Sequence, residues 1–178
     1  MGANSKVGIV TGAGGGIGRA IKMKLARQGV LVVLVDLVSQ GIDLLAQEVR
    51  QAGGEAVTHC MDVGDEAQVH DCINKTVADH GRIDILVNNA GISPKKSNGS
   101  KAYLTEISLS EWEKVMRVNL TSVFLMCRAV IPHMVTQASG SIVNISSSAA
   151  LDGGILAATH YSASKGAVSA LTRTLSKE

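Results

Sequence analysis

Tyr161 and Lys165 lie four residues apart in the segment Tyr-Ser-Ala-Ser-Lys. If this segment is helical, the two side chains lie on one face of the helix, one turn apart. A nearby ammonium group stabilises the phenolate form of a tyrosine, so the pair could take a proton from an alcohol or give one to a ketone. The same spacing occurs by chance in many helices as a solvated pair. The rest of the chain therefore decides what the pair means.

A glycine-rich turn near the N-terminus is a second functional element. Residues 11–18 read Thr-Gly-Ala-Gly-Gly-Gly-Ile-Gly, after the apolar run 7–10 and before a helix-like segment at 17–28. Glycines here allow a sharp turn, close approach of the backbone to a pyrophosphate, and close packing of the helix on the sheet. The helix start adds free amides and a partial positive charge. This context predicts a dinucleotide site that includes Gly12, Gly14, Gly16, Ile17 and Gly18.

Asp36 ends the apolar run 30–35 and lies 18 positions after Gly18. A carboxylate there can accept hydrogen bonds from both hydroxyls of the adenosine ribose, worth about 1.5–3 kcal/mol each. It would repel a 2′-phosphate, and the next residues, Leu37 and Val38, carry no positive charge. The sequence therefore favours NAD(H) over NADP(H). The alternative is that Asp36 only caps a turn or a helix.

Short apolar runs alternate with helix-length amphipathic segments along the whole chain. We expect strands at residues 7–10, 30–35, 56–61, 83–87 and 141–145. We expect helices at 17–28, from 39, from 65, from 109, and around 161–177. This alternation predicts an α/β fold: a Rossmann-like, doubly wound parallel sheet in three α/β/α layers. Because no linker or internal repeat divides the chain, residues 1–178 are predicted to form a single dinucleotide-binding domain.

Local signals predict where several helices begin and end. Ser39 is expected to cap the second helix, and Asp65 is expected to open the third. Ser108 and Glu111 have the spacing of a capping box at the start of the long fourth helix. Pro132 is expected to kink or end that helix.

Composition and charge exclude several classes of protein. Hydrophobic residues make up 46% of the 178-residue chain and charged residues 18%, which is ordinary globular composition. The formal charge is +2 without a long basic run, so nucleic-acid binding is not expected. The loop with Lys95, Lys96 and Lys101 is interpreted as solvated, with contact to an anionic substrate as the alternative. No apolar run long enough to cross a bilayer and no room for a signal peptide are seen, so we expect a cytoplasmic protein without a membrane partner.

The cysteines and histidines do not form a metal-binding pattern. Cys60, Cys72 and Cys127 are widely spaced, odd in number and lack a C-x-x-C pair. Reduced, mostly buried thiols in an intracellular protein are therefore expected. The five histidines add no ligand spacing, so no metal site is predicted.

Several motifs in the chain resemble the short-chain dehydrogenase/reductase family, with matching residues from Thr11 to Lys165. The glycine turn looks like the family's TGxxxGxG, and residues 62–63 (Asp-Val) are similar to its Asp-hydrophobic pair beside the adenine. Residues 88–91 match the family's NNAG, which ends the fourth strand on the cofactor side. The resemblance therefore adds to the cofactor site Asp62, Val63, Asn89, Ala90 and Gly91.

The resemblance also implies an activity and a role for each residue of a catalytic group. The activity is hydride transfer between NAD(H) and a secondary alcohol or ketone, as in 3-oxoacyl-carrier-protein reductases and sugar or polyol dehydrogenases. Tyr161 would be the general acid/base, and Lys165 would favour its phenolate and hold the nicotinamide ribose, so that both residues also contact the cofactor. Asn119 looks like the family's asparagine on the long helix, which holds a water in a proton relay.

The serine of this group has two candidates in the run from Ser146 to Ser148. Strand register against the family's I-S-S ending selects Ser147, whereas the usual distance back from Tyr161 selects Ser148. Ser147 is preferred because a strand end is more rigid than the loop beyond it. Adjacent strand residues face opposite ways, so Ser146 and the other hydroxyl are expected to be structural.

Family members continue beyond the Tyr/Lys helix with two more strands, a nicotinamide-contacting loop and a substrate lid. The sequence here ends at Glu178, so the C-terminal strands are expected to be missing and the fifth strand to form an open edge. The resemblance further implies a homo-oligomer, either a dimer or a tetramer. The alternative function is a dinucleotide-binding or interaction module without turnover. Oxidation of NADH by the parent and by Tyr161→Phe would distinguish the two functions.

Overall fold

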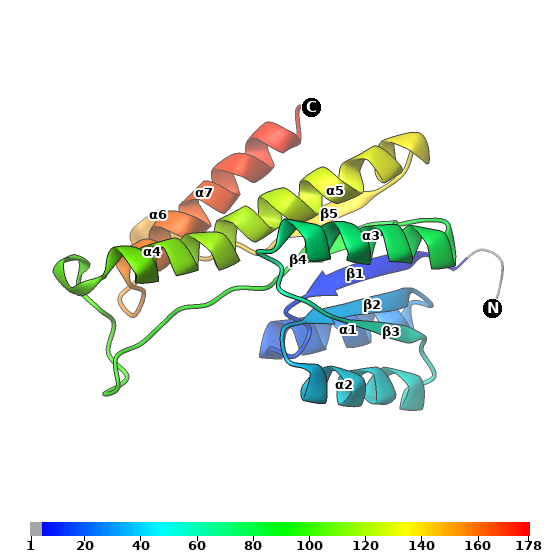
Figure 1. Cartoon of the computed structure of the whole chain (residues 1–178), viewed down its shortest axis with the longest axis horizontal. Coiled ribbons are helices and arrows are strands. Elements are labelled where there is room, and N and C mark those ends of the chain that lie inside the picture. The colour runs from blue at the N-terminus through cyan, green and yellow to red at the C-terminus, as the bar shows by residue number, and fades with distance from the viewer. Residues whose placement is uncertain (1–4) are drawn as a thin grey trace. The chain divides into compact units, whose positions relative to one another are not determined.

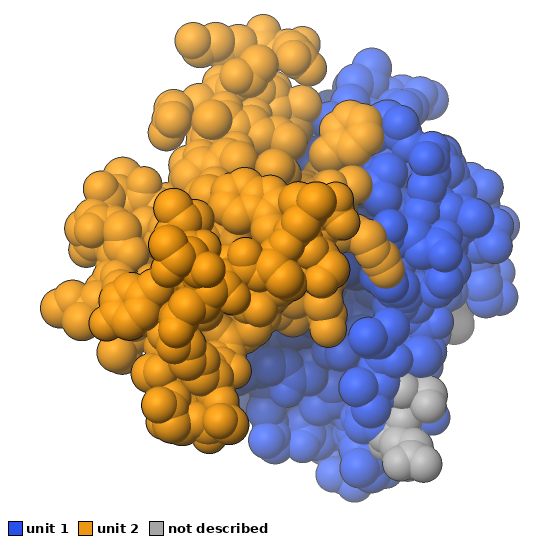
Figure 2. Space-filling model, turned by 60° about the vertical axis from the view of Figure 1, so that its left-hand side comes forward, with its two compact units in different colours: residues 1–90, 125–143 blue, residues 91–124, 144–178 orange. Residues whose placement is uncertain are grey.

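The computed structural model describes residues 5–178, apart from the side chains of Ser39 and Gln40 (Figure 1). The described chain divides into two compact units (Figure 2). Unit 1 contains residues 5–90 and 125–143, and unit 2 contains residues 91–124 and 144–178. The glycine turn lies in unit 1 and the Tyr/Lys helix lies in unit 2.

Five strands form one sheet among the described residues, in the order β3-β2-β1-β4-β5. Their bounds are Val7–Thr11 (β1), Leu31–Asp36 (β2), Ala56–Cys60 (β3), Ile85–Asn88 (β4) and Ser141–Asn144 (β5). β1 pairs in parallel with β2 and β4, and β2 pairs in parallel with β3. The chain therefore moves outward from β1 in both directions, which confirms the predicted doubly wound sheet.

Burial of the central strands explains their composition. Every residue of β1 is buried, as is every residue of β2 except Asp36 at its end. A parallel strand covered on both faces needs apolar side chains on both, which is why these strands consist of β-branched residues and Leu apart from Gly8 and the terminal Asp36. Thr11 is in register with Val35, so Gly12, which follows β1, and Asp36, which ends β2, lie at the same end of the two strands.

Helices cover both faces of the sheet in unit 1. Figure 1 shows α1 (Gly16–Arg27) and α2 (Ser39–Gln51) on one side of the strands and α3 (Glu66–His80) on the other. The result is the three-layer, Rossmann-like α/β fold predicted from the alternation.

Two predicted helix starts in unit 1 can be checked directly. The N-cap of α3 is Asp65, whose carboxylate accepts the N–H of Gln68 at 3.1 Å, as predicted. Ser39 is the first residue of α2 rather than its cap, so that prediction is wrong. The cap position belongs to Val38, whose backbone is extended, because the chain is already helical at Ser39.

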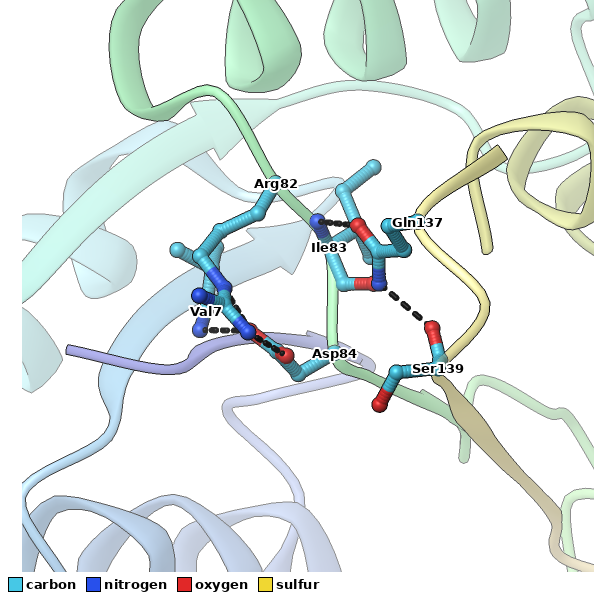
Figure 3. Close-up of polar contacts among 6 residues, drawn as sticks. All are labelled: Val7, Arg82, Ile83, Asp84, Gln137 and Ser139. Atoms are coloured by element: carbon cyan, nitrogen blue, oxygen red, sulfur yellow. Dashed lines mark hydrogen bonds and ion pairs between the residues drawn. The ribbon is translucent and has the colours of Figure 1, made fainter. Parts of the chain in front are cut away.

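The amino end of β4 is held by a polar cluster (Figure 3). The buried carboxylate of Asp84 accepts the N–H of Val7 at 2.8 Å and two N–H groups of Arg82 at 2.8 and 2.6 Å. Burial alone would raise the pKa of Asp84, but the Arg82 guanidinium and the Val7 amide outweigh it and hold the pKa below its usual value. The carboxamide of Gln137 donates to the carbonyls of Ile83 and Ser139 at 2.5 and 2.6 Å. The buried carboxylate of Asp84 and the nearby backbone groups are thus hydrogen-bonded at the amino ends of the strands, opposite to the end where Gly12 lies.

Unit 2 consists mainly of helices. Its elements are η1 (Leu104–Glu106), α4 (Leu109–Met116), a π-helix η2 (Arg117–Thr121), the start of α5 (Ser122–Thr136), α6 (Ala149–Asp152) and α7 (Thr159–Leu175). The hydroxyl of Ser108 accepts the N–H of Glu111 at 3.1 Å, which is one half of the predicted capping box. The other half is not formed, because the carboxylate of Glu111 lies 2.9 Å from Nε2 of His160.

The long helix differs from its prediction in two ways. Pro132 lies inside α5, which continues to Thr136, so Pro132 does not end the helix. α4, η2 and α5 together form a helical run, Leu109–Thr136, that is long and apolar enough to cross a membrane by length and composition. The expectation that no apolar run reaches that length is therefore wrong. Half of the most apolar window of this run is buried, however, and a core helix of a soluble protein passes the same test.

Candidate active site

Two glycines have no room for a side chain, one in the turn after β1 and one in the first turn of α1. Gly12 has a positive φ of 62°, and a Cβ there would lie 2.8 Å from Cα of Ala90. A Cβ at Gly18 would lie 2.2 Å from the carbonyl oxygen of Gly12. These glycines are therefore required by the turn itself and by its approach to residue 90.

The start of α1 has the donors that an anion needs. Its N-cap is Gly15, which has no side chain that could accept an amide of the first turn. The first turn also contains no acidic residue. Residues 14–17 are exposed, and a Cβ at Gly16 would meet no atom within 4 Å. The first amides of the helix therefore lie open beside a surface without side chains, which fits a pyrophosphate.

Asp36 lies next to this turn. Its Oδ2 accepts the N–H of Gly14 at 2.9 Å, and its Oδ1 accepts the N–H of Leu37 at 2.8 Å. Asp36 thus does cap a turn, as the alternative interpretation holds. Each carboxylate oxygen still has a lone pair for a ribose hydroxyl, so the two roles are compatible.

Asn89 supports the turn through the backbone. Its Nδ2 donates to the carbonyls of Thr11 and Gly12 at 3.0 and 2.9 Å. The hydroxyl of Thr11 accepts the N–H groups of Asn89 and Ala90, both at 3.0 Å. The ends of β1 and β4 are therefore fixed to each other beside the glycine turn.

The predicted adenine pair follows β3 at the same edge of the sheet. The N–H of Met61 donates to the carbonyl of Asp36 at 3.0 Å, which brings the residues after β3 beside the end of β2. Asp62 is half-buried and accepts the N–H of Gly64 at 2.8 Å, and Val63 is buried. Unit 1 therefore brings together the predicted cofactor residues Gly12, Gly14, Gly16, Ile17, Gly18, Asp36, Asp62, Val63, Asn89 and Ala90.

In unit 2, Tyr161 and Lys165 lie on α7 as the spacing predicts. Nζ of Lys165 lies 6.0 Å from the centroid of the Tyr161 ring and donates to the carbonyl of Ile145 at 2.7 Å. Only 4% of the surface of Lys165 is exposed, and this burial lowers the pKa of its ammonium group. A buried cation with one carbonyl partner is thus held beside the phenol.

Asn119 lies at the centre of η2 and is fully buried. Its Oδ1 accepts the N–H of Ile92 at 2.8 Å, and its Nδ2 donates to the carbonyl of Ile92 and to the hydroxyl of Ser164, both at 3.0 Å. A Cβ on Gly91 would lie 3.4 Å from Oδ1 of Asn119 and 3.5 Å from Nζ of Lys165. Gly91, Asn119 and Lys165 therefore lie in one cluster.

The serine run lies beyond β5 rather than at its end. β5 stops at Asn144, earlier than predicted, so the argument that Ser147 occupies a rigid strand end is wrong. Ser147 is half-buried and accepts the N–H of Ala149 at 3.2 Å, whereas Ser148 is the exposed N-cap of α6. Ser146 donates to the carbonyl of Lys165 at 2.8 Å and so ties this segment to α7.

Three features near Tyr161 were not identified from the sequence: the π-helix around Asn119, the hydroxyl of Ser164, and the contact between His160 and Glu111. Ser164 had a signal, because it lies three residues after Tyr161 and therefore on the same helix face. His160 and Glu111 are 49 residues apart in the chain, so no local spacing indicates their contact.

The described residues 5–178 contain no group of three or more His, Cys, Asp or Glu side chains that could hold a metal ion. Cys60, Cys72 and Cys127 form no disulfide; Cys72 and Cys127 are buried and Cys60 is exposed. Burial raises the pKa of the Cys72 and Cys127 thiols to about 11, so both are poor nucleophiles. The expectation of mostly buried thiols is confirmed.

The site and the fold together define a class of protein. The family described as short chain dehydrogenase matches residues 6–178, and the chain belongs to this family of oxidoreductases. Over its whole length the chain is 36% identical to the 3-oxoacyl-[acyl-carrier-protein] reductase FabG of Thermotoga maritima, and it spans 70% of that protein.

Solved structures agree with this assignment. An NAD-bound 3-oxoacyl-[acyl-carrier protein] reductase from Brucella melitensis superposes with a TM-score of 0.89 at 37% identity, over 96% of this chain and 64% of that one. A metagenomic short-chain oxidoreductase in complex with NADP superposes with a TM-score of 0.90 at 34% identity, over 98% of this chain and 77% of that one. Similar chains thus bind either nicotinamide dinucleotide.

Proposed function

We propose that this chain is an NAD(H)-dependent oxidoreductase that interconverts a secondary alcohol and a ketone, with Tyr161 as the general acid/base. The observation that carries the proposal is the buried ammonium of Lys165 beside the Tyr161 phenol on α7. A cation held there favours the phenolate, which is the form that removes a proton from an alcohol. The reverse reaction uses the phenol to protonate a ketone oxygen.

The residues of unit 1 fit the cofactor. The open amides at the start of α1 would bind the pyrophosphate, and Asp36 would accept the hydroxyls of the adenosine ribose. Asp62 and Val63 would contact the adenine. When bound, the nicotinamide supplies or receives the hydride.

The residues of unit 2 would manage the proton. Lys165 would stabilise the Tyr161 phenolate, and Asn119 would belong to the relay that returns the proton to solvent. The hydroxyl of Ser147 would donate a hydrogen bond to the substrate oxygen and so keep it near the phenol. The bond from the Ala149 amide uses only an acceptor lone pair of Ser147, so its proton remains available, and Ser148 is the alternative for this role.

A carbonyl panel tests the activity. We expect oxidation of NADH with a ketone such as a 3-oxoacyl thioester or a keto sugar, and loss of turnover by about 100-fold or more in Tyr161→Phe. Tyr103→Phe is the matched control, because Tyr103 is the other tyrosine of the chain and lies exposed before η1. Cofactor binding without turnover on any carbonyl would instead support a binding module.

Asp36 decides the cofactor preference that we propose. A carboxylate at that position repels a 2′-phosphate, so NAD(H) should bind more tightly than NADP(H). Asp36→Ala should narrow the difference in Kd, whereas Asp71→Asn, at an exposed position of α3, should leave it unchanged. A parent chain that prefers NADP(H) would contradict this assignment.

We also propose a homo-oligomeric, cytoplasmic protein. The apolar run Leu109–Thr136 is then a core helix rather than a membrane span, in keeping with the burial of half of its most apolar window. Sedimentation of the purified chain in detergent-free buffer tests the oligomeric state and the assignment of this run as a core helix. A monomer, or a chain that needs detergent to remain in solution, would contradict them.

A further inference from the structure

His160 is a buried titratable side chain for which the proposed reaction has no use. It directly precedes Tyr161 in the first turn of α7, and none of its surface is exposed. Buried imidazoles need partners for both ring nitrogens, and each nitrogen of His160 has one.

The two partners fix the tautomer of the ring. Nδ1 accepts the backbone N–H of Tyr161 at 2.8 Å and therefore carries no proton. The neutral ring then has its proton on Nε2, which lies 2.9 Å from Oε1 of Glu111 and donates to it. His160 thus connects the amide of Tyr161 to a carboxylate on α4.

This connection replaces a missing helix cap. The N-cap of α7 is Ala158, which has no side-chain oxygen to accept an amide of the first turn. Nδ1 of His160 supplies that acceptor for Tyr161. Glu111 is itself held in place, because its N–H donates to the capping hydroxyl of Ser108 at 3.1 Å.

The carbonyl of Tyr161 is held in the same manner. It accepts the hydroxyl of Ser164 at 2.7 Å, and Ser164 accepts the amide of Asn119 at 3.0 Å. Glu111 and Asn119 belong to one continuous helical run. Both backbone polar groups of Tyr161 are therefore tied, through one α7 side chain each, to that run.

We propose that His160 and Glu111 are positioning residues that hold the backbone of Tyr161 and thereby aim its phenol. The proposal rests on the proposed function, because it treats Tyr161 as the acid/base. Neither residue takes a proton from the substrate. Their effect is on the rate of the step in which the Tyr161 proton moves, and not on the binding of the cofactor.

Two substitutions of His160 separate its hydrogen bonds. His160→Asn places an amide near the position of Nδ1 and can still accept the Tyr161 N–H, but it cannot reach Glu111. His160→Gln places an amide near the position of Nε2 and can still donate to Glu111, but it leaves the Tyr161 N–H without its acceptor. We expect both to lower kcat by about ten- to hundredfold, with the KM for NADH unchanged.

Substitution of Glu111 tests the same proposal without changing the buried ring of His160. A third of its side chain is exposed, so the chain should fold when it is replaced. Glu111→Ala should lower kcat like the His160 variants, and Glu111→Gln, which keeps an acceptor oxygen, should restore most of it. Thr172→Val is the matched control, because it removes the bond from Asn144 at 2.9 Å on the same helix, three turns beyond Tyr161.

NMR of the full chain tests the positioning without turnover. The ring of His160 should show the tautomer with its proton on Nε2, and His160→Gln and Glu111→Ala should shift the amide and ring signals of Tyr161. The other tautomer, or unmoved Tyr161 signals together with unchanged kcat in both variants, would overturn the proposal. If Tyr161→Phe turns over like the parent, or the parent has no turnover, the proposed function fails, while the NMR result still decides whether the pair positions Tyr161.

Discussion

The amide of Asn119 donates to the hydroxyl of Ser164 over 3.0 Å, and both side chains are fully buried. The hydroxyl of Ser164 in turn donates to the carbonyl of Tyr161 at 2.7 Å, so Ser164 links Asn119 to the backbone of Tyr161. A buried polar chain of this kind is costly to break, since each member left unpaired keeps its desolvation penalty.

Ser164→Ala should therefore lower both stability and turnover. Removal of the hydroxyl leaves the Asn119 amide with one partner fewer in a buried site, and we expect a loss of about 1–3 kcal/mol in the free energy of unfolding. Urea unfolding and kcat measure the two effects. Ser162→Ala is the control, since its hydroxyl donates to the carbonyl of Gly153 from a half-buried position on the same helix. Equal losses of unfolding free energy and kcat in the two variants would show that the hydrogen bond between Asn119 and Ser164 contributes no more than the exposed bond of Ser162.

The glycine turn allows a test that separates folding from cofactor binding. Gly18→Ala places a Cβ 2.2 Å from the carbonyl oxygen of Gly12, so the turn must move. We expect a loss of about 1–3 kcal/mol in stability, as in other overpacked sites, together with loss of NAD(H) binding.

Gly16→Ala is the partner of that experiment. Its Cβ meets no atom within 4 Å, so the stability of the free chain should be unchanged or slightly higher. NAD(H) binding should nevertheless weaken, because the added methyl group lies on the surface that we assign to the pyrophosphate. Calorimetric titration and thermal unfolding give the two quantities. If Gly16→Ala binds NAD(H) as tightly as the parent, the pyrophosphate does not bind at the start of α1.

The alternation of apolar runs and helices was enough to predict the sheet and the position of the glycine turn beside Asp36. Parallel strands that leave a sheet at one edge bring their following residues together, so Gly12 and Asp36 had to be neighbours once the order of strands was known. The strand ends were predicted less well, because β5 stops at Asn144 and leaves Ser147 in a loop. That end depends on pairing partners that one segment of sequence does not show.

The support of Tyr161 could not be predicted for a related reason. Glu111 has the spacing of a capping-box residue, and local reasoning assigned its carboxylate to Ser108. In the structure, Oε1 of Glu111 lies 2.9 Å from Nε2 of His160, which is distant in the sequence. The π-helix at Asn119 likewise has no local sequence signal, since the segment 117–121 contains no Pro or Gly that would mark an irregular turn.

Asp84 predicts how the chain responds to acid. Despite burial, the Arg82 guanidinium and the Val7 amide hold the folded pKa of Asp84 below that of an ordinary aspartate, so the ionised carboxylate stabilises the folded state above the ordinary pKa, and this stability is lost as pH falls through the folded pKa. Asp84→Asn should remove this contribution and destabilise the chain at pH 7 by about 1.5–3 kcal/mol, because a bond to Arg82 and a buried charge partner are lost. Its unfolding free energy should then change less than that of the parent between pH 5 and pH 2. Parallel curves for parent and variant would contradict the assignment.

Lys165 predicts a second rise of stability with pH, at alkaline pH. Burial lowers its folded pKa below 10.5, so between the folded pKa and 10.5 the unfolded chain binds a proton that the folded chain does not. The parent should therefore gain stability as pH rises through this window, whereas Lys165→Met, which lacks the group, should not. Turnover should be lost in the variant at every pH, since no cation remains beside Tyr161. The measurement is the difference in unfolding free energy between parent and variant from pH 7 to pH 10.5, with Lys24→Met as the control for loss of an exposed positive charge on α1. A difference that stays constant over this range would mean that the ammonium of Lys165 is solvated rather than buried.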